Sequence, residues 1–399
     1  MLGGTMGGLI IAPKARLFHG HDWVYGTEVR AVYGSPQPGD VVSLKDQRDR
    51  FLGSAIYNPQ SQIIARRFSR RKQELDADFF LRRISQALDL RLRRLPGEEL
   101  CRLVWSESDG LPGLVVDRYK DVLVVQALTL AMRRHLDHVV AALRELLAPA
   151  CILLRNDSPM LVAEGLEPES SVLYGQLPPP FVASGRGTQF LVDPTQGQKT
   201  GLYLDQMDNY QAVARLAKGR RVLDCFSNQG GFALACAMAG AQSVTAVDIS
   251  DTAIRSVRSN AELNGVSVET VVENAFDFLK RESDAVRNGA APKWDLIILD
   301  PPSFTRNRKS VNGALRGYKE IHLRAMQMLP VGGILSTFCC SHHISTPLFH
   351  GIVAEAAVDG HSTLRLVATH GQSADHPVLL NIPETEYLKG ATYELVPGR

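Results

Sequence analysis

The spacing of hydrophobic and polar positions changes from one region of the chain to the next. Residues from about 8 to 70 form short apolar runs broken by turn signals such as SPQPGD (35–40), which is typical of a small all-β module. From about Asp76 the apolar residues recur at three- and four-residue spacing, which predicts an amphipathic helix that ends before Pro96. The apolar positions of this helix are Leu81, Ile84, Leu88 and Leu92.

The pattern changes twice more toward the C-terminus. Residues 101–130 read as strands around a Gly/Pro turn and residues 135–147 as a helix, which together predict an α+β module. A stretch rich in Pro and Gly, GQLPPPFVASGRG (175–187), indicates a linker. Beyond it, apolar strands, glycine turns and helices alternate, which predicts a mostly parallel, doubly wound α/β sheet. We therefore expect three domains, at 1–74, 75–178 and 179–399.

Composition excludes several classes of protein. The 399 residues are 45% hydrophobic and 22% charged, as in soluble globular proteins. No apolar run reaches the roughly 20 residues needed to span a bilayer, so we expect no membrane association. The six cysteines show no spacing suited to zinc, and we expect no metal site. Scattered cysteines without a disulfide pattern favour a cytoplasmic location.

Positive charge gathers near the N-terminus. The formal net charge is only +2, but residues 14–94 hold 16 Lys and Arg against 9 Asp and Glu. Arg66, Arg67, Arg70 and Arg71 form one cluster, and further arginines follow one helix later, at 91, 93 and 94. Such clusters attract phosphate backbones by counterion release. A solvated face beside a linker has the same composition, so charge alone leaves both interpretations open.

Polar residues recur where the predicted parallel strands end. In open α/β sheets ligands bind at that edge. Asp224 ends one strand before a glycine turn, Asp248 ends the next strand, where it can accept hydrogen bonds from ribose hydroxyls, and Asn274 follows the third, beside an adenine edge. Glycines followed by an acid also occur in dinucleotide-binding enzymes. Asp224, however, would repel a pyrophosphate and suits the positive amino-acid end of S-adenosylmethionine. The candidate cofactor-binding residues of these strand ends are Asp224, Phe226, Ser227, Asn228, Gly230, Gly231, Asp248 and Asn274.

The fourth strand ends in the sequence DPPSF (300–304), in which two prolines stiffen the loop that follows Asp300. Methyltransferases that act on exocyclic amino groups usually have an aromatic residue directly after these prolines. Here Ser303 precedes Phe304, which disfavours that class.

Two cysteines, Cys339 and Cys340, end the fifth strand. Methylation of a pyrimidine at carbon 5 requires a thiolate to add to carbon 6 first. Adjacent strand residues point to opposite faces, so only one of the two can serve. Free cysteines are also common as small buried hydrophobes, and position alone does not decide between the two interpretations.

Five ordered motifs together resemble the RlmI-type methyltransferases of bacteria, which form 5-methylcytosine in large-subunit ribosomal RNA. They are GQKTGLYLDQMDN (197–209), DCFSNQGGFAL (224–234), DPPSF (300–304), FCCS (338–341) and QSADHPV with PETEYLKG (372–390). The N-terminal β module resembles the PUA domain of that family, and ESDGLPGLVVDRY (107–119) resembles its middle domain. The third domain would then be a Rossmann-like class I methyltransferase domain.

The resemblance implies specific roles. Cys340 is then the nucleophile, and Asp300 hydrogen-bonds N3 of the target cytosine and borders the cofactor. Four further residues also border the cofactor pocket: Lys199, Thr200, Asp205 and Gln206. The expected cofactor is S-adenosylmethionine and the expected partner is large-subunit ribosomal RNA. The candidate RNA-binding residues are Arg66, Arg67, Arg70, Arg71 and Phe304.

Two positions depart from the family pattern. Ser303 stands where better-known RNA cytosine-5 methyltransferases have a second cysteine that helps to release the product, which leaves the group that removes the carbon 5 proton open. Met207 stands where the family usually has arginine. Two alternative functions remain: methylation of a guanine nitrogen on the same fold, and RNA binding by a ribosome assembly factor without catalysis. The sequence does not identify the nucleotide methylated or the oligomeric state, for which we expect a homodimer.

Overall fold

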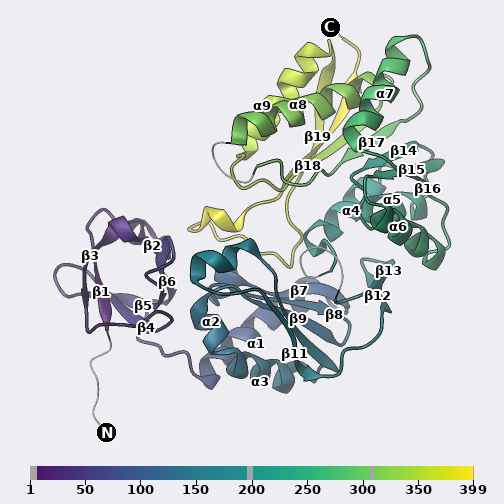
Figure 1. Ribbon diagram of the computed structural model, residues 1–399. Coiled ribbons are helices and arrows are strands. Elements are labelled where there is room, and N and C mark those ends of the chain that lie inside the picture. The colour runs from purple at the N-terminus through teal and green to yellow at the C-terminus, as the bar shows by residue number, and fades with distance from the viewer. Residues whose placement is uncertain (1–6, 196–200, 306–309, 399) are drawn as a thin grey trace. The chain divides into compact units, whose positions relative to one another are not determined.

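The computed structural model describes residues 7–195, 201–305 and 310–398, which form two compact units (Figure 1). The first unit lies within Met1–Ala183, Val192–Leu204 and Ala374–Thr385. The second lies within Ser184–Leu191, Asp205–Ser373 and Glu386–Arg399. The first unit thus contains a late segment, 374–385, that follows most of the second unit in sequence. The domain boundaries at 74 and 178 stay predictions.

The first unit begins with the expected all-β module. Its six-stranded sheet has the order β2-β6-β5-β4-β1-β3. The strands are β1 (Gly8–Ile11), β2 (Trp23–Tyr25), β3 (Val29–Tyr33), β4 (Val41–Lys45), β5 (Phe51–Tyr57) and β6 (Ile63–Ser69). Short 3-10 helices at Arg16–His19 and Gly26–Glu28 join the first three strands. Leu9, Val24, Val42 and Leu44 form a small closed core inside this sheet.

The second part of the first unit is an α+β layer. Five strands in the order β11-β10-β9-β8-β7 form its sheet. They are β7 (Leu100–Trp105), β8 (Leu114–Tyr119), β9 (Val122–Ala127), β10 (Cys151–Asn156) and β11 (Glu169–Gly175). The helices are α1 (Ala77–Arg94), α2 (Leu130–Arg134) and α3 (Leu136–Leu147), with 3-10 turns η3 (Ser106–Asp109) and η4 (Pro159–Glu164). Helices α1 and α3 pack against each other and share one apolar core with the sheet.

Helix α1 confirms the predicted helix but corrects its buried face. Asp76 caps it by accepting a hydrogen bond from the backbone N–H of Phe79 at 2.8 Å. Ile84 and Leu88 are buried as predicted, whereas Leu92 is 61% exposed. The neighbouring Arg91 is buried instead, at 3% exposure. The apolar stripe therefore ends one turn early, where Arg91 meets a carboxylate described below.

The predicted linker is partly ordered as a hairpin. Strands β12 (Phe181–Gly185) and β13 (Thr188–Val192) pair with each other around a two-residue turn. The turn residues Arg186 and Gly187 both have positive φ, of 49° and 81°, as expected for tight hairpins of right-handed twist.

The second unit is the expected doubly wound sheet, with strand order β16-β15-β14-β17-β18-β20-β19. Strands β14 (Arg221–Cys225), β15 (Ser243–Asp248), β16 (Glu269–Val272), β17 (Leu296–Leu299) and β18 (Ile334–Cys339) are parallel. Strands β19 (Thr363–His370) and β20 (Lys389–Val396) add an antiparallel edge. The central strands are almost continuously apolar, because helices cover both of their faces.

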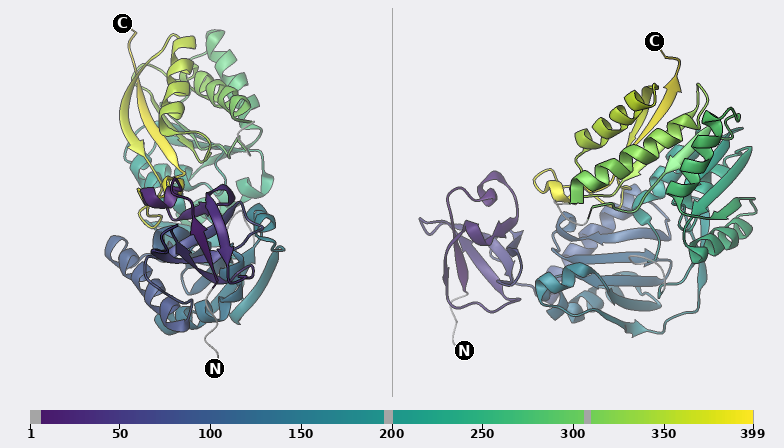
Figure 2. Two further views of the ribbon diagram at one scale, coloured as in Figure 1. Left: turned by 90° about the vertical axis from the view of Figure 1, so that its left-hand side faces the viewer. Right: turned by 45° about the horizontal axis from the view of Figure 1, so that its top comes forward.

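Two helical layers enclose this sheet (Figures 1 and 2). Helices α4 (Met207–Ala214), α5 (Gly231–Met238) and α6 (Asp251–Leu263) pack side by side in one layer. Helices α7 (Ala275–Arg287), α8 (Val311–Gln327) and α9 (Thr346–Asp359) form the other. Among the described residues, no helix is both long enough and apolar enough to cross a membrane.

The register of the parallel strands brings their carboxyl ends to one level. Cys225 at the end of β14 pairs with Val247 of β15 and with Leu299 of β17. Leu299 in turn pairs with Thr337, near the end of β18. The polar residues that directly follow these strands therefore lie along one edge of the sheet.

Candidate functional site

The turn after β14 is shaped for close approach of its backbone to a ligand. Phe226, Asn228 and Gly230 all have positive φ, of 62°, 47° and 85°. Such values are uncommon outside glycine and often mark functional turns. A Cβ atom on Gly231 would lie 2.2 Å from the ring of Tyr210, so only glycine fits where α5 begins. The predicted glycine turn is therefore present and tightly constrained.

Asp224 is a buried acid with unused hydrogen-bonding capacity. It is 1% exposed, and its Oδ2 accepts a hydrogen bond from the backbone N–H of Ala233 at 3.1 Å. Its Oδ1 has no hydrogen-bond partner among the described residues. Burial raises the pKa of Asp224 well above its ordinary value, and the nearby carboxylates of Asp300 and Asp248 raise it further. A cationic group beside Oδ1 would remove this penalty.

Asp248 is held by backbone groups rather than by cations. Its Oδ2 accepts a hydrogen bond from the N–H of Asn228 at 2.9 Å, and its Oδ1 accepts one from the N–H of Ser250 at 2.9 Å. Each oxygen of a carboxylate can accept a second bond, so Asp248 can still accept from vicinal hydroxyls. Asp248 lies beside the Phe226–Gly230 turn, and its predicted contact to a ribose stays a prediction.

Asn274 and Ser227 complete this part of the edge. The Oδ1 of Asn274 caps α7 by accepting from the N–H of Phe276 at 2.9 Å, which leaves its exposed amide N–H₂ group to donate to a base. The hydroxyl of Ser227 is buried and has no partner among the described residues. An unsatisfied carboxylate, an unsatisfied hydroxyl and a constrained glycine turn fit the amino-acid and nucleoside parts of S-adenosylmethionine.

A relay of amide side chains positions Asp300. The Nδ2 of Asn209 donates to the Oε1 of Gln206 at 2.6 Å, and the Nε2 of Gln206 donates to the Oδ1 of Asp300 at 3.0 Å. Both amide residues are buried. Asn209 also donates to the carbonyl of Gly371 at 2.8 Å, which fixes the relay to a second loop. The structure therefore brings two of the predicted site residues, Gln206 and Asp300, into direct contact.

Asp205 is held by a tyrosine from the C-terminal end of the chain. Its Oδ2 accepts a hydrogen bond from the hydroxyl of Tyr387 at 2.6 Å. Its backbone carbonyl accepts bonds from the N–H and the hydroxyl of Ser373. Lys199 and Thr200, predicted to border the same pocket, lie outside the described residues.

The two strand-end cysteines occupy different environments. Cys339 is fully buried and belongs to the apolar core of the second unit. Cys340 follows β18 directly and is partly exposed. The next residue, Ser341, is hydrogen-bonded through its hydroxyl to that of Ser303 at 2.9 Å. This bond ties the cysteine loop to the DPPSF loop, so Cys340 and Asp300 lie on two connected loops.

A buried lysine stands beside the cysteine pair. Lys389 is the cross-strand partner of Cys339, and its Nζ donates to the carbonyls of Ser341 and Ile344 at 2.9 Å. Burial lowers the pKa of Lys389, whereas the nearby sulfur atoms of Cys339 and Cys340 act in the opposite direction. A positive charge held at this place stabilises a thiolate.

Phe304 lies within an aromatic cluster. Its ring centroid is 4.7 Å from that of Tyr318 and 5.6 Å from that of Phe276. The side chain is partly exposed, so one part of the ring packs on the core. The role of Phe304 in RNA binding stays a prediction. Its contacts with Tyr318 and Phe276 hold the ring in place.

The four predicted RNA-binding arginines divide into two pairs. Arg66 and Arg67 are buried, at 9% and 8% exposure, and form ion pairs with Glu107 and Asp22. Arg70 and Arg71 follow β6 and are exposed. The first two are thus neutralised within the protein, and only the second two present charge to solvent.

Sequence reasoning missed Asn209, Tyr387 and Lys389. Tyr387 and Lys389 do fall in a motif that carried the resemblance, EYLKG (386–390), but they come near the site only because β20 returns beside β18. Asn209 likewise ends the motif GQKTGLYLDQMDN (197–209), but its role depends on contacts with Gln206 and with Gly371, a loop 162 residues away in sequence.

Comparisons with known proteins identify the family of the chain. A family model for a PUA-like domain matches residues 12–70, and one for an S-adenosylmethionine-dependent methyltransferase matches residues 106–377. The chain is 40% identical to "Ribosomal RNA large subunit methyltransferase I" of Erwinia tasmaniensis, over 96% of this chain and 98% of that protein. It is 41% identical to the protein of the same name from Shewanella denitrificans, over 93% and 94%.

Solved structures share the fold over nearly the whole chain. A protein described as a methyltransferase and solved in complex with SAH has a TM-score of 0.83 and 23% identity, covering 98% of this chain and 100% of that one. A Streptococcus mutans protein has a TM-score of 0.81 and 22% identity over the same shares. The resemblance drawn from the motifs is confirmed. The chain therefore belongs to the family of S-adenosylmethionine-dependent methyltransferases and is an enzyme that takes its methyl group from that cofactor.

Proposed function

We propose that the protein methylates carbon 5 of a cytosine in large-subunit ribosomal RNA through a covalent adduct with Cys340. One observation carries the choice of atom: a partly exposed cysteine follows β18 and is tied through Ser341 and Ser303 to the loop of Asp300. A guanine nitrogen would need no nucleophile there. The names of the relatives support ribosomal RNA as the substrate.

In this proposal Cys340 adds to the base and later leaves it. The thiolate of Cys340 forms a bond to carbon 6, and the electron pair of the carbon 5–carbon 6 double bond moves so that carbon 5 becomes nucleophilic. S-adenosylmethionine, when bound, supplies a methyl group on a positively charged sulfur. Once carbon 5 carries that methyl group, a base removes its proton, the thiolate leaves carbon 6 and the double bond is restored.

Two acids and a lysine support these reaction steps. In this proposal Asp300 hydrogen-bonds N3 of the base, which lets the ring accept charge when sulfur adds to carbon 6, and the hydrogen bond from Gln206 to its Oδ1 supports this role. The Nζ of Lys389, which donates to the carbonyls of Ser341 and Ile344 next to Cys340, favours the thiolate of Cys340 whenever the lysine is charged. Asp224 offers its unpaired oxygen to the ammonium group of the cofactor.

The substrate must reach a pocket on the protein, so we infer that the target cytosine is flipped out of its stack. Single-stranded or loosened RNA meets this need best, because the deep, narrow major groove of duplex RNA shields carbon 5. The cytoplasmic location and the homodimer expected from the sequence remain part of this proposal.

The first experiment is bisulfite sequencing of large-subunit ribosomal RNA from cells with and without this gene. Deletion is expected to expose one protected cytosine, and wild-type protein is expected to restore its protection. Cys340→Ala should fail to restore it, whereas the matched control Cys339→Ala should succeed if it folds. An unchanged pattern after deletion would rule out cytosine-5 methylation and favour a guanine nitrogen.

A trapping experiment tests the adduct directly. RNA that contains 5-fluorocytidine cannot lose a proton from carbon 5, so the protein should stay bonded to it once the methyl group is transferred. We expect a band of increased mass on a denaturing gel with the wild type and with Cys339→Ala, and none with Cys340→Ala. A trapped Cys340→Ala protein would assign the nucleophile to another residue.

A further inference from the structure

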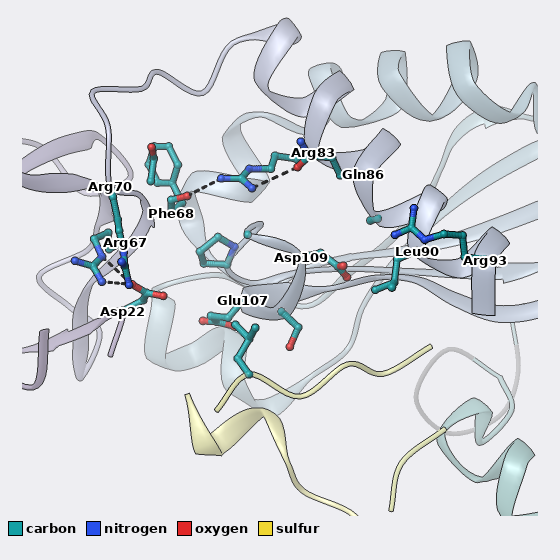
Figure 3. Close-up of a pocket in the computed structure, with 16 residues that line it drawn as sticks. Asp22, Arg67, Phe68, Arg70, Arg83, Gln86, Leu90, Arg93, Glu107 and Asp109 are labelled. Atoms are coloured by element: carbon teal, nitrogen blue, oxygen red, sulfur yellow. Dashed lines mark hydrogen bonds and ion pairs between the residues drawn. The ribbon is translucent and has the colours of Figure 1, made fainter. Parts of the chain in front are cut away.

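The first unit contains a cavity of about 480 Å³ that the cofactor site does not use (Figure 3). It lies between the end of β6, helix α1 and the η3 turn, with Leu379 of the late segment at its border. Its volume falls within the range of ligand-binding pockets. Seven of its lining residues are charged: Asp22, Arg67, Arg70, Arg83, Arg93, Glu107 and Asp109.

Every acid of this lining is paired with an arginine of the same unit. Asp22 accepts from Arg67 at 2.7 Å, and Glu107 accepts from Arg66 at 2.7 Å. Asp109 accepts from Arg91 at 2.6 Å and from the backbone N–H of Trp105 at 2.6 Å. The negative charges of the cavity are therefore cancelled internally, and none is left for a cationic ligand.

Three arginines of the lining have no carboxylate partner among the described residues: Arg70, Arg83 and Arg93. Arg83 is half-buried and bonds only neutral acceptors, the Oε1 of Gln86 at 3.5 Å and the carbonyl of Phe68 at 3.3 Å. Burial lowers the pKa of Arg83, as does the neighbouring Arg82. An isolated, partly desolvated guanidinium gains more from an anion than a fully solvated one.

Glycine keeps Arg83 accessible. A Cβ atom on Gly110 would lie 3.2 Å from the guanidinium carbon of Arg83. Gly110 also has a φ of 69°, which a side chain would strain. The η3 turn therefore ends in a residue that leaves room beside the unpaired cation.

We propose that this cavity holds a short single-stranded stretch of the RNA substrate, with its phosphates against Arg70, Arg83 and Arg93. The inference rests on the proposed RNA substrate and adds the place where the strand is held. It replaces the buried Arg66 and Arg67 with two arginines of α1: Arg93, which belongs to the second arginine group of the sequence analysis, and Arg83, which that analysis did not name.

The layout favours an extended polyanion over a single small anion. Arg83 and Arg93 are ten residues apart on α1, a rise of about 15 Å. Figure 3 shows Arg83 directed toward Phe68, Arg93 at the other end of the cavity and Arg70 on the β6 side. One phosphate cannot contact all three, whereas successive phosphates of one strand can. Leu90 and Leu379 add apolar surface for sugars and bases.

The test measures RNA binding apart from methyl transfer. A fluorescein-labelled single-stranded RNA of about 12 nucleotides, within the usual site size, is titrated with full-length protein over a range of salt concentrations. We compare the wild type with a triple variant, Arg70→Gln, Arg83→Gln and Arg93→Gln. The matched control replaces three exposed cations of the β module, Lys14→Gln, Arg30→Gln and Arg48→Gln, for the same change of charge.

Losing three phosphate contacts is expected to reduce the slope of log affinity against log salt by about 2. Affinity at low salt should fall at least about tenfold, by the same factor for RNAs of different sequence, whereas the control should keep the wild-type slope. Single variants, each expected to reduce the slope by about 0.7, serve if the triple variant does not fold. A triple variant with the wild-type slope would overturn the inference.

The two proposals fail in different ways. If the wild type methylates carbon 5 and the triple variant binds RNA normally, only the cavity assignment is wrong. If the triple variant loses the salt slope but deletion of the gene leaves the bisulfite pattern unchanged, the cavity binds RNA and only the proposed reaction is wrong.

Discussion

Asp224 in the second unit and Asp109 in the first are both buried carboxyl groups, but their surroundings are opposite. Asp109 has an arginine and a backbone N–H as donors, with both side chains of the ion pair at most 5% exposed. Asp224 has one backbone donor, two carboxylates nearby and an oxygen without a partner among the described residues. One acid is satisfied within the protein, and the other keeps one oxygen without a partner among the described residues.

The difference shows how the charge of a ligand can be read from a site. Counting charged residues misleads, because the cavity of the first unit has three acids and still presents only cations once its internal ion pairs are removed. At the edge of the sheet, Asp224 is a buried acid that has no arginine or lysine partner among the described residues. Buried charges that stay unpaired are costly. The charge left unpaired in a site therefore indicates a ligand of the opposite charge.

Removing the carboxylate of the paired acid should have the largest effect on the free energy of unfolding. Asp109→Ala leaves Arg91 buried without its carboxylate, so we expect the first unit to lose about 3–5 kcal/mol of unfolding free energy. The measurement is urea denaturation followed by circular dichroism. Asp89→Ala, an exposed acid on the same helix as Arg91, is the matched control and should change little. Equal stability of the two variants would mean that the carbonyl acceptors of Arg91 suffice to stabilise it.

Removing the unpaired acid should affect binding and not stability. Asp224→Asn keeps an acceptor for the N–H of Ala233 but removes the negative charge. We expect affinity for S-adenosylmethionine to fall by about 2–4 kcal/mol, roughly 30- to 1000-fold, by analogy with buried charge pairs at interfaces. The unliganded protein should unfold at an equal or higher temperature, because a buried unpaired charge is gone.

Isothermal titration calorimetry and a thermal melt of the same samples test both halves of that prediction. The control is Asp251→Asn, an exposed acid on α6. A variant that keeps its cofactor affinity would show that the ammonium group binds elsewhere on the edge.

Much of the fold could be predicted because it depends on local patterns. The short apolar stretches VL (222–223) before DCFSN and LIIL (296–299) before DPPSF lie in β14 and β17, and the alternation of strand and helix predicted the parallel sheet. The return of β20 beside β18 depends on a pairing about 50 residues apart in sequence, and no local pattern indicates it. The same holds for the segment 374–385, which belongs to the first unit.

The residues of the candidate site also divide into those that local patterns predict and those that depend on long-range contacts. Asp224, Asp248, Asp300 and the two cysteines could be named as candidates because each lies at the carboxyl end of a strand or directly after it. The burial of Arg66 could not be predicted, because its partner Glu107 comes from the η3 turn, 41 residues away in sequence. Arg91 is held by the carbonyl of Asp375, 284 residues away. Whether a charge is free or paired is decided by tertiary contacts, and composition does not contain them.

The smallest expected effect is a pH dependence of opposite sign for two buried acids of the unliganded protein. Burial raises the pKa of Asp224 in the folded state, so its contribution to stability is complete below the unfolded pKa and is lost as pH rises through the folded pKa. For Glu107, burial acts to raise the pKa, but Arg66 and hydrogen bonds outweigh it and lower the pKa. Its contribution is therefore present above the unfolded pKa and is lost as pH falls through the folded pKa.

Thermal melts of the wild type, Asp224→Asn and Glu107→Gln across acid and neutral pH separate the two. Asp224→Asn should remove part of the decline in stability toward higher pH, and Glu107→Gln part of the decline toward lower pH. A pKa shift of one unit corresponds to about 1.4 kcal/mol, which moves the melting temperature of units this size by about 3–6 °C. Adding S-adenosylmethionine should abolish the wild-type decline toward higher pH, because its ammonium group stabilises the charged form of Asp224. If the cofactor leaves that decline unchanged, the unpaired oxygen of Asp224 does not face the ammonium group. The difference between Asp224 and Asp109 would then not mark a cofactor site.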